Sequence, residues 1–223
     1  MKSQAFLVLD KTDGNQNHLS MAALILENSE VRKLVSVLSV EAYHRLSELG
    51  LISSKTELIE GVVFDKMTKS PDYGYYSDLL FEFLSAIKPQ DCIIRCEKPL
   101  TLNRWEPEPD ISIIKGSLQD FKNVNPSTAV LIVEIANTSI SYDREKISVY
   151  AEAGVANYWI ADLKKMQVET YQKPLKNEYL QKTVYGINDQ IPIFDSFIDL
   201  QKVFTEKEWN SADLLGSEKI ITI

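Results

Sequence analysis

Residues 129–136 read Ala-Val-Leu-Ile-Val-Glu-Ile-Ala, an apolar run of strand-forming residues that a single carboxylate, Glu134, interrupts. Val and Ile favour strands, and a run without polar alternation is typical of a strand that is buried on both faces. A buried carboxylate without a partner is costly, so Glu134 must be paired, hydrogen-bonded or metal-bound. This stretch therefore predicts a central strand with an unusual polar site within it.

The segments around this strand predict a mixed sheet that is flanked by helices. Strands are expected over residues 56–65, with a turn or bulge at Glu60-Gly61, and over 92–95, 111–114 and 157–161; helices are expected over 40–49, 72–86 and 143–153. Residues 168–171 and 179–185 flank Lys173-Pro174 and predict a hairpin at the sheet edge. The alternation of strands and helices gives the fold class α/β.

The sequence indicates one main domain. It shows no repeat, no low-complexity tract and no Pro/Gly/Ser-rich linker, so residues 39–223 are expected to fold together. Residues 1–38 show weaker signals and are taken as an N-terminal extension of unclear structure. No apolar run is long enough to cross a membrane, and the first residues do not read as a secretory signal.

Charge, cysteine and histidine content narrow the function. The net charge of -8 argues against a protein that bulk electrostatics hold on nucleic acid, although a bound cation reverses the field locally. The two cysteines, Cys92 and Cys96, are expected on one face of a strand as buried thiols, which fits a reducing cytoplasm. The histidines are His18 and His44, so any histidine-dependent hydrolase must use one of them; His44 is expected at the surface.

A second carboxylate, Asp110, is expected close to Glu134. It follows Glu106-Pro107-Glu108-Pro109, in which the prolines keep the chain extended up to the next apolar strand. Alone, a Pro-Asp pair is typical of a turn, and a strand glutamate is typical of an edge or an ion pair. Together with a lysine downstream, Lys146, the two carboxylates favour a Mg²⁺ site, because Mg²⁺ is commonly held by one or two carboxylates and waters.

These residues resemble a known family. Pro109-Asp110 followed by Glu134 is similar to the metal-binding core of the PD-(D/E)XK nucleases, and over residues 40–203 the chain resembles a restriction endonuclease family that is abundant in cyanobacteria. The motifs that carry this resemblance are Glu57-Leu-Ile-Glu-Gly61, Pro109-Asp110, Val133-Glu134, residues 143–146 with Tyr150, and Gly154-Val-Ala-Asn-Tyr-Trp-Ile160. Three positions depart from the pattern: Ala136 replaces the usual lysine, Tyr73 a histidine and Asn157 a glutamate.

The resemblance implies a restriction-endonuclease-like fold and a Mg²⁺-dependent endonuclease that hydrolyses phosphodiester bonds of DNA. Asp110 and Glu134 would bind Mg²⁺, for which Mn²⁺ would substitute. Lys146, expected three positions into a helix that starts near Asp143, would orient the attacking water or steady the developing negative charge. Glu57 would complete the metal shell or support a second ion. Relatives of this kind tend to pair, so a homodimer is expected.

Other interpretations stay open from the sequence. Lys146 could be an ordinary salt-bridging helical lysine, and Glu57 an ordinary surface carboxylate. The chain could be a catalytically inactive nuclease-fold module that binds nucleic acid or a protein partner, which predicts Mg²⁺ binding without cleavage. It could also be an acidic interaction subunit that binds no DNA, which predicts no mobility shift at low salt.

Overall fold

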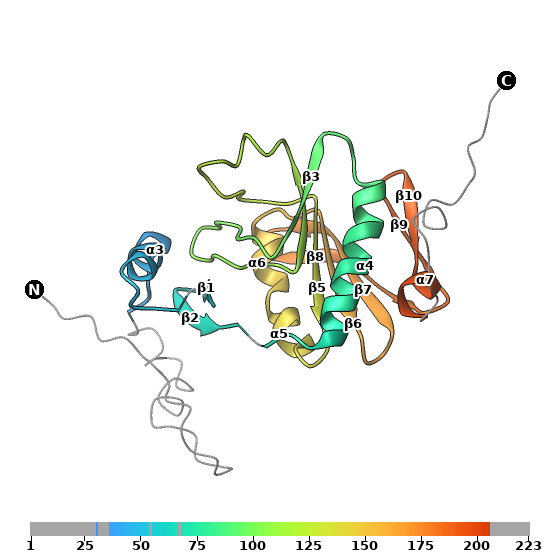
Figure 1. Cartoon of the computed structure of the whole chain (residues 1–223), viewed down its shortest axis with the longest axis horizontal. Coiled ribbons are helices and arrows are strands. Elements are labelled where there is room, and N and C mark those ends of the chain that lie inside the picture. Colours follow the sequence, from blue (N-terminus) through green and yellow to red (C-terminus); the bar gives the residue numbers. More distant parts are fainter. Residues whose placement is uncertain (1–29, 31–35, 54, 67, 206–223) are drawn as a thin grey trace, which may run out of the picture.

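The computed structural model describes residues 30, 36–53, 55–66 and 68–205, and its centre is a six-stranded mixed sheet (Figure 1). The strands lie in the order β3 (Cys92–Cys96), β4 (Ile111–Lys115), β5 (Leu131–Ala136), β6 (Asn157–Asp162), β7 (Gln167–Leu175) and β8 (Glu178–Gly186). Strands β5 and β6 pair in parallel, and every other pair in this sheet is antiparallel. The expected α/β class with a mixed sheet is confirmed.

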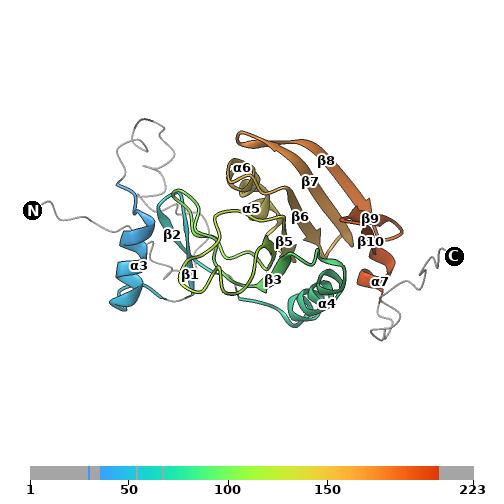
Figure 2. The ribbon, with the colours of Figure 1, turned by 90° about the horizontal axis from the view of Figure 1, so that it is seen from above.

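Helices cover both faces of the sheet, as the view from above shows (Figure 2). One face carries helix α4 (Pro71–Ile87), the hairpin of β9 (Gln190–Ile193) and β10 (Ser196–Asp199), and helix α7 (Leu200–Phe204). The other face carries helices α5 (Ile140–Glu145) and α6 (Ile147–Glu152). The sheet thus separates two apolar cores, and its strands are buried from both sides as their composition predicts.

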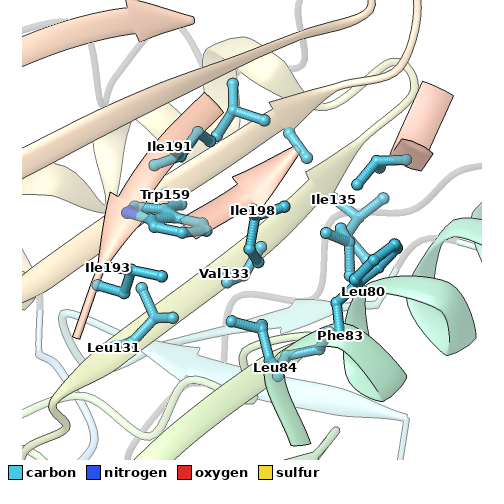
Figure 3. Packing of buried hydrophobic residues seen from close by; sticks show 14 of the residues in the cluster. Leu80, Phe83, Leu84, Leu131, Val133, Ile135, Trp159, Ile191, Ile193 and Ile198 are labelled. Carbon is cyan, nitrogen blue, oxygen red and sulfur yellow. The ribbon is translucent and has the colours of Figure 1, made fainter. Parts of the chain in front are cut away.

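Alternation along β5 decides which way its carboxylate points. Leu131, Val133 and Ile135 pack against α4 and the β9–β10 hairpin, where they meet Leu80, Phe83, Ile193 and Ile198 (Figure 3). Ile132 and Ala136 belong to the core under α5 and α6. Because strand side chains alternate between faces, Glu134 points to the α5–α6 face. Each fully buried Leu or Ile contributes about 1.5–3 kcal/mol, so this register is strongly favoured over a one-residue slip.

A smaller unit lies beside the sheet and carries Glu57. Helix α3 (Val40–Glu48) begins where Ser39 accepts a hydrogen bond from the Ala42 amide at 3.1 Å, and it is followed by the antiparallel hairpin of β1 (Thr56–Ile59) and β2 (Val62–Asp65). Its two-residue turn, Glu60-Gly61, has positive φ at both positions, +48° and +76°. This geometry matches the expected turn and suits a tight hairpin.

The helix expected over residues 143–153 is in fact two helices, and this corrects the predicted setting of Lys146. Helix α5 begins at Ile140, and Lys146 stands at the junction between α5 and α6 instead of inside a helix. The Lys146 amide donates to the Asp143 carbonyl at 3.2 Å, an i to i−3 bond that tightens the end of α5. The break lets the lysine side chain turn toward the sheet.

The edge hairpin is longer than expected, and its turn is displaced. Lys173-Pro174 was expected between the strands, but Pro174 lies in β7 opposite Tyr179, next to the outermost strand of the sheet. The chain reverses after Leu175, where Lys176 adopts a φ of +55°. The β9–β10 hairpin and α7 were not predicted.

Part of the expected domain plan lies outside the described residues. This holds for the extension expected over residues 1–38, apart from residues 30 and 36–38, and for residues 206–223 of the expected domain. None of the helices that the structure describes combines the length and apolarity that a bilayer crossing requires.

Candidate active site

Strand register places Asp110 beside Glu134. Ile111 of β4 is opposite Val133 of the antiparallel β5, so the preceding residue on β4 meets the following residue on β5. The Asp110 carboxylate accepts a hydrogen bond from the Ile135 amide at 2.7 Å, and the Asp110 amide donates to Glu134 Oε2 at 3.4 Å. Two carboxylates therefore lie side by side where β4 begins and β5 ends.

Lys146 reaches the same place from the junction of α5 and α6. Its Nζ lies 3.2 Å from Glu134 Oε1, and Tyr150 Oη donates to that oxygen at 2.9 Å. Only 7% of the lysine side chain is exposed. The residue is therefore a buried ammonium in contact with the strand carboxylate and not an exposed helical lysine.

Further acidic and aromatic side chains enclose this ammonium. Lys146 Nζ lies 3.6 Å from Glu57 Oε1 and 3.9 Å from Asp143 Oδ1, and it sits 4.7 Å from the centre of the Tyr142 ring. The Tyr142 hydroxyl donates to Glu57 at 2.5 Å. Glu57 is buried, so the surface-carboxylate interpretation is wrong, and it joins the cluster through Lys146. A lysine held from three sides has little rotational freedom.

The cluster contains more carboxylates than ammonium groups, and the pKa values of its members are shifted accordingly. Burial raises the pKa of Glu134 to about 8; Lys146 opposes this effect, and Asp110 adds to it by repulsion. Burial likewise raises the pKa of Asp143 to about 6 and raises the pKa of Asp110. For Lys146, burial lowers the pKa, but the carboxylates of Glu134 and Glu57 outweigh it and leave the pKa raised. The ammonium stays charged while the carboxylates repel one another.

A second group of side chains borders Asp110 on the side away from Lys146. Tyr73, on the first turns of α4, donates to Asp110 Oδ1 at 2.5 Å, and Lys69 Nζ lies 3.8 Å from the same oxygen. Lys69 also forms an ion pair with Glu97 at 2.5 Å. Asp110 is therefore held between a tyrosine hydroxyl and a backbone amide, with a lysine nearby.

Two carboxylates of the cluster are suited to one hydrated divalent cation. Among the residues that the structure describes, no group of three or more His, Cys, Asp or Glu side chains is arranged to hold a metal ion. Asp110 and Glu134 still supply two adjacent, mutually repelling oxygen donors, and Mg²⁺ commonly binds one or two carboxylates while it keeps several waters. A divalent cation between them would relieve their repulsion, so these residues suit a hydrated ion better than a full protein cage.

The structure thus brings together all four residues singled out from the sequence. Sequence reasoning gave no role to Asp143 and Tyr150, which it quoted only within motifs, or to Tyr73, which it noted only as a departure. It missed Lys69, Glu97 and Tyr142. Tyr142 was detectable in principle because it lies one residue before the 143–146 motif, whereas no local pattern marks Lys69 or Glu97.

The remaining candidates lie outside this cluster. His44 is half-exposed and forms a hydrogen-bonded pair with Glu106, so the expected surface position is confirmed. Cys92 is buried and Cys96 half-buried. His18 lies outside the described residues.

The six-stranded mixed sheet with helices on both faces is similar to a nuclease fold. One solved structure, described as "a putative nuclease belonging to DUF820" from Anabaena variabilis, superimposes with a TM-score of 0.62 at 17% sequence identity and covers 75% of this chain and 97% of that one. Residues 40–204 match the model of the Uma2 family, which is described as "Putative restriction endonuclease", and the chain belongs to this family. The curated proteins contain no match. The resemblance expected from the sequence is thereby confirmed.

Proposed function

We propose that this protein is a Mg²⁺-dependent endonuclease that hydrolyses phosphodiester bonds of DNA. The observation that carries the proposal is the meeting of Asp110, Glu134 and Lys146, from three separate segments, at one buried end of β4 and β5. Burying these charged groups costs desolvation energy that an apolar residue at Glu134 would avoid. Membership of a nuclease-like family supports the reaction class.

Asp110 and Glu134 would hold the Mg²⁺, with Mn²⁺ as a substitute. When bound, the ion would lower the pKa of a coordinated water and offset the charge that builds on the phosphate in the transition state. Hydrogen bonds within the chain orient both carboxylates. The Ile135 amide and Tyr73 orient the Asp110 carboxylate, and Tyr150 and Lys146 orient one oxygen of Glu134.

Lys146 would supply a fixed positive charge to the reacting centre. Its ammonium is compact, buried and held by Glu57 and Asp143, so it can donate to the reacting water or to a developing anionic oxygen without reorganisation. Glu57 is the fourth member of the site. Its contacts with Lys146 and Tyr142 support a part in holding the lysine, rather than one as a direct third ligand beside Asp110 and Glu134.

Nicking of supercoiled plasmid by the purified protein with Mg²⁺ tests the proposal. Asp110→Asn removes a proposed ligand charge and Lys146→Ala removes the ammonium, and each should lower the nicking rate by about a hundredfold or more. Lys115→Gln is the matched control, because this exposed lysine lies at the opposite end of β4 from Asp110. Equal rates in all four proteins would overturn the proposal.

One observation favours a second candidate, a nuclease-fold module that binds nucleic acid or a partner without cutting it. Every oxygen of the Asp110 and Glu134 carboxylates already has a protein donor, including Tyr73 where many relatives have histidine. A site satisfied in this way could have lost turnover. Metal binding by calorimetry, combined with no nicking at any Mg²⁺ or Mn²⁺ concentration, would establish this alternative over the enzyme.

The proposal extends to a cytoplasmic homodimer, because two nuclease centres in one particle can address both strands of a duplex. Light scattering on the purified protein should give about twice the chain mass of 25.4 kDa. A mass equal to one chain at micromolar concentration would contradict the dimer and would leave the single-centre reaction untouched.

A further inference from the structure

The charged residues on the two sides of Asp110 differ in solvent exposure: those on one side, the closed side, are buried, and those on the other, the open side, are exposed. On the closed side Lys146, at the junction of α5 and α6, is only 7% exposed. On the open side stand Lys69 and Glu97, with 38% and 47% of their side chains exposed. Lys69 and Glu97 are therefore the solvent-exposed charged groups beside Asp110, and a substrate that approaches on this side meets them.

Lys69 is held in a defined position there. Its Nζ donates to Tyr73 Oη at 2.8 Å and lies 4.4 Å from the centre of the Tyr73 ring. The next residue, Ser70, caps α4 by accepting from the Tyr73 amide at 3.2 Å, which ties the lysine backbone to a seventeen-residue helix. The ammonium is therefore both ordered and accessible, a combination that Lys146 does not offer.

The ion-pair partners of Lys69 are two carboxylates. Glu97 Oε1 lies 2.5 Å from the ammonium and Asp110 Oδ1 lies 3.8 Å away. Glu97 is half-exposed, so its ion pair with Lys69 contributes little to stability and can exchange readily with another anion. A phosphate oxygen could replace the Glu97 carboxylate without any change in the backbone.

We propose that Lys69 binds a phosphate of the nucleic-acid backbone next to the Asp110–Glu134 pair, and that Glu97 occupies the phosphate position when no substrate is bound. The proposal rests on the proposed function and assigns the residue that receives the substrate. It also addresses the net charge of -8, because a protein that repels phosphate at long range needs a local cation at its site. Tyr73 positions Lys69 and Asp110 relative to each other.

Fluorescence anisotropy with a labelled duplex oligonucleotide tests this assignment, with Ca²⁺ in place of Mg²⁺, as a salt series. Lys69→Gln should weaken binding at low salt by about tenfold, as expected for one charge-assisted hydrogen bond. The slope of log affinity against log salt should fall in magnitude by about 0.9, the value for one phosphate contact. Glu97→Gln should strengthen binding, because it releases Lys69 from its ion pair and removes a negative charge that repels the phosphate.

Lys115→Gln is the control for charge alone, because it also removes an exposed lysine that is paired with a carboxylate, Asp91, at 3.5 Å. Its salt slope should equal that of the wild type. Equal slopes for Lys69→Gln and Lys115→Gln would overturn the assignment, and Asp110-dependent nicking by the wild type would then keep the proposed function intact.

Two further outcomes separate the proposals. Binding that depends on Lys69, without nicking by the wild type, would keep the phosphate assignment and overturn the endonuclease. A wild type that binds no duplex and no single-stranded oligonucleotide at low salt would overturn both. A thermal melt of each variant shows whether it folds, and the exposed position of Lys69 predicts unchanged melting temperatures for both lysine variants.

Discussion

Two buried glutamates on the same face of the sheet have opposite surroundings. Glu134 of β5 and Glu169 of β7 are both in register with Ile160 of β6, one on each side of it. Each is almost fully buried. Yet burial raises the pKa of Glu134 to about 8, whereas the pKa of Glu169 falls to about 2 because its hydrogen bonds outweigh its burial.

The partners explain the difference. Glu169 accepts two hydrogen bonds from the Arg144 guanidinium and one from the Tyr171 hydroxyl at 2.5 Å. It also forms an ion pair with Lys182 at 3.0 Å. One carboxylate thus faces two cations, and the group joins α5 to β7 and β8. Around Glu134 the balance is reversed, because Glu134, Glu57 and Asp143 share the buried ammonium of Lys146, and the neighbouring Asp110 adds further negative charge.

The ion pairs of Glu169 stabilise the fold, whereas the carboxylates around Glu134 repel one another and destabilise it. A carboxylate with two cations and a hydroxyl is satisfied, so no ligand is needed to account for Glu169. A surplus of negative charge at Glu134 makes the unliganded protein less stable than it could be. Surplus charge of this kind is typical of active sites, where the missing charge comes from a metal or a substrate.

The largest expected difference between the two glutamates is in activity. Glu134→Gln removes a proposed metal ligand and should lower plasmid nicking by several-hundred-fold, because the electrostatic stabilisation that the ion supplies is worth about 3–4 kcal/mol. Glu169→Gln leaves every proposed ligand in place and should retain nicking within about tenfold per folded molecule. Similar losses of nicking activity in the two variants would contradict the assignment of Glu134, and not Glu169, to the active site.

Stability should show the reverse order. Glu169→Gln leaves Arg144 and Lys182, both half-exposed, without their carboxylate and should lower the free energy of unfolding by about 1–2 kcal/mol, or the melting temperature by roughly 2–8 °C. Glu134→Gln without metal should cost far less, because it removes a carboxylate from an acidic cluster. Differential scanning calorimetry in EDTA measures both, and a larger loss in Glu134→Gln would contradict the comparison.

The two carboxylates should also give opposite slopes of stability against pH. An ordinary glutamate pKa is 4.5, so raising that of Glu134 to about 8 withdraws stability as pH rises from 4.5 to 8. Lowering that of Glu169 to about 2 adds stability that is lost only as pH falls from 4.5 toward 2.

Urea unfolding in EDTA at pH 5 and pH 8.5 compares wild type with Glu134→Gln. The glutamine is neutral throughout, so the variant should gain on the order of 4 kcal/mol relative to wild type between the two pH values. Parallel stability curves would mean that Glu134 titrates normally in the folded protein.

The smallest expected effect is that of Tyr150→Phe. The substitution removes the hydroxyl that donates to Glu134 at 2.9 Å but keeps the buried ring, and Lys146 still contacts the same oxygen. A loss of about 1 kcal/mol in unfolding free energy is expected, with a loss of activity of about tenfold or less. Tyr158→Phe is the control ring, because its hydroxyl donates to the Asp143 carbonyl and not to a site carboxylate.

Sequence reasoning found Glu134 and not Glu169 for a physical reason. Glu134 interrupts an otherwise apolar strand, and such an interruption is visible locally. Glu169 lies in the alternating run Val168-Glu169-Thr170-Tyr171, which reads as an edge strand with a solvent-facing carboxylate. Only the placement of α5 over that face brings Arg144 to it, and tertiary placement of this kind leaves no local pattern.

A local pattern also misled the prediction of where Lys146 lies in the fold. Its family position marked it as a site residue, but the continuous helical pattern of residues 143–153 concealed the junction that turns it inward. The strands β3 to β6 and the α4 helix were predictable as elements, because their apolar residues recur with the period that burial imposes. Lys69 and Glu97 were not, because exposed charged residues follow no period and meet only in the folded chain.

The most direct measurement is a crystal grown or soaked with Mn²⁺ and examined by anomalous scattering. The account predicts one ion between the carboxylates of Asp110 and Glu134, within about 2.0–2.3 Å of an oxygen of each, and none at Glu169, where Arg144 and Lys182 already supply the positive charge. A crystal at millimolar Mn²⁺ that shows no density at Asp110 and Glu134 would contradict the central claim.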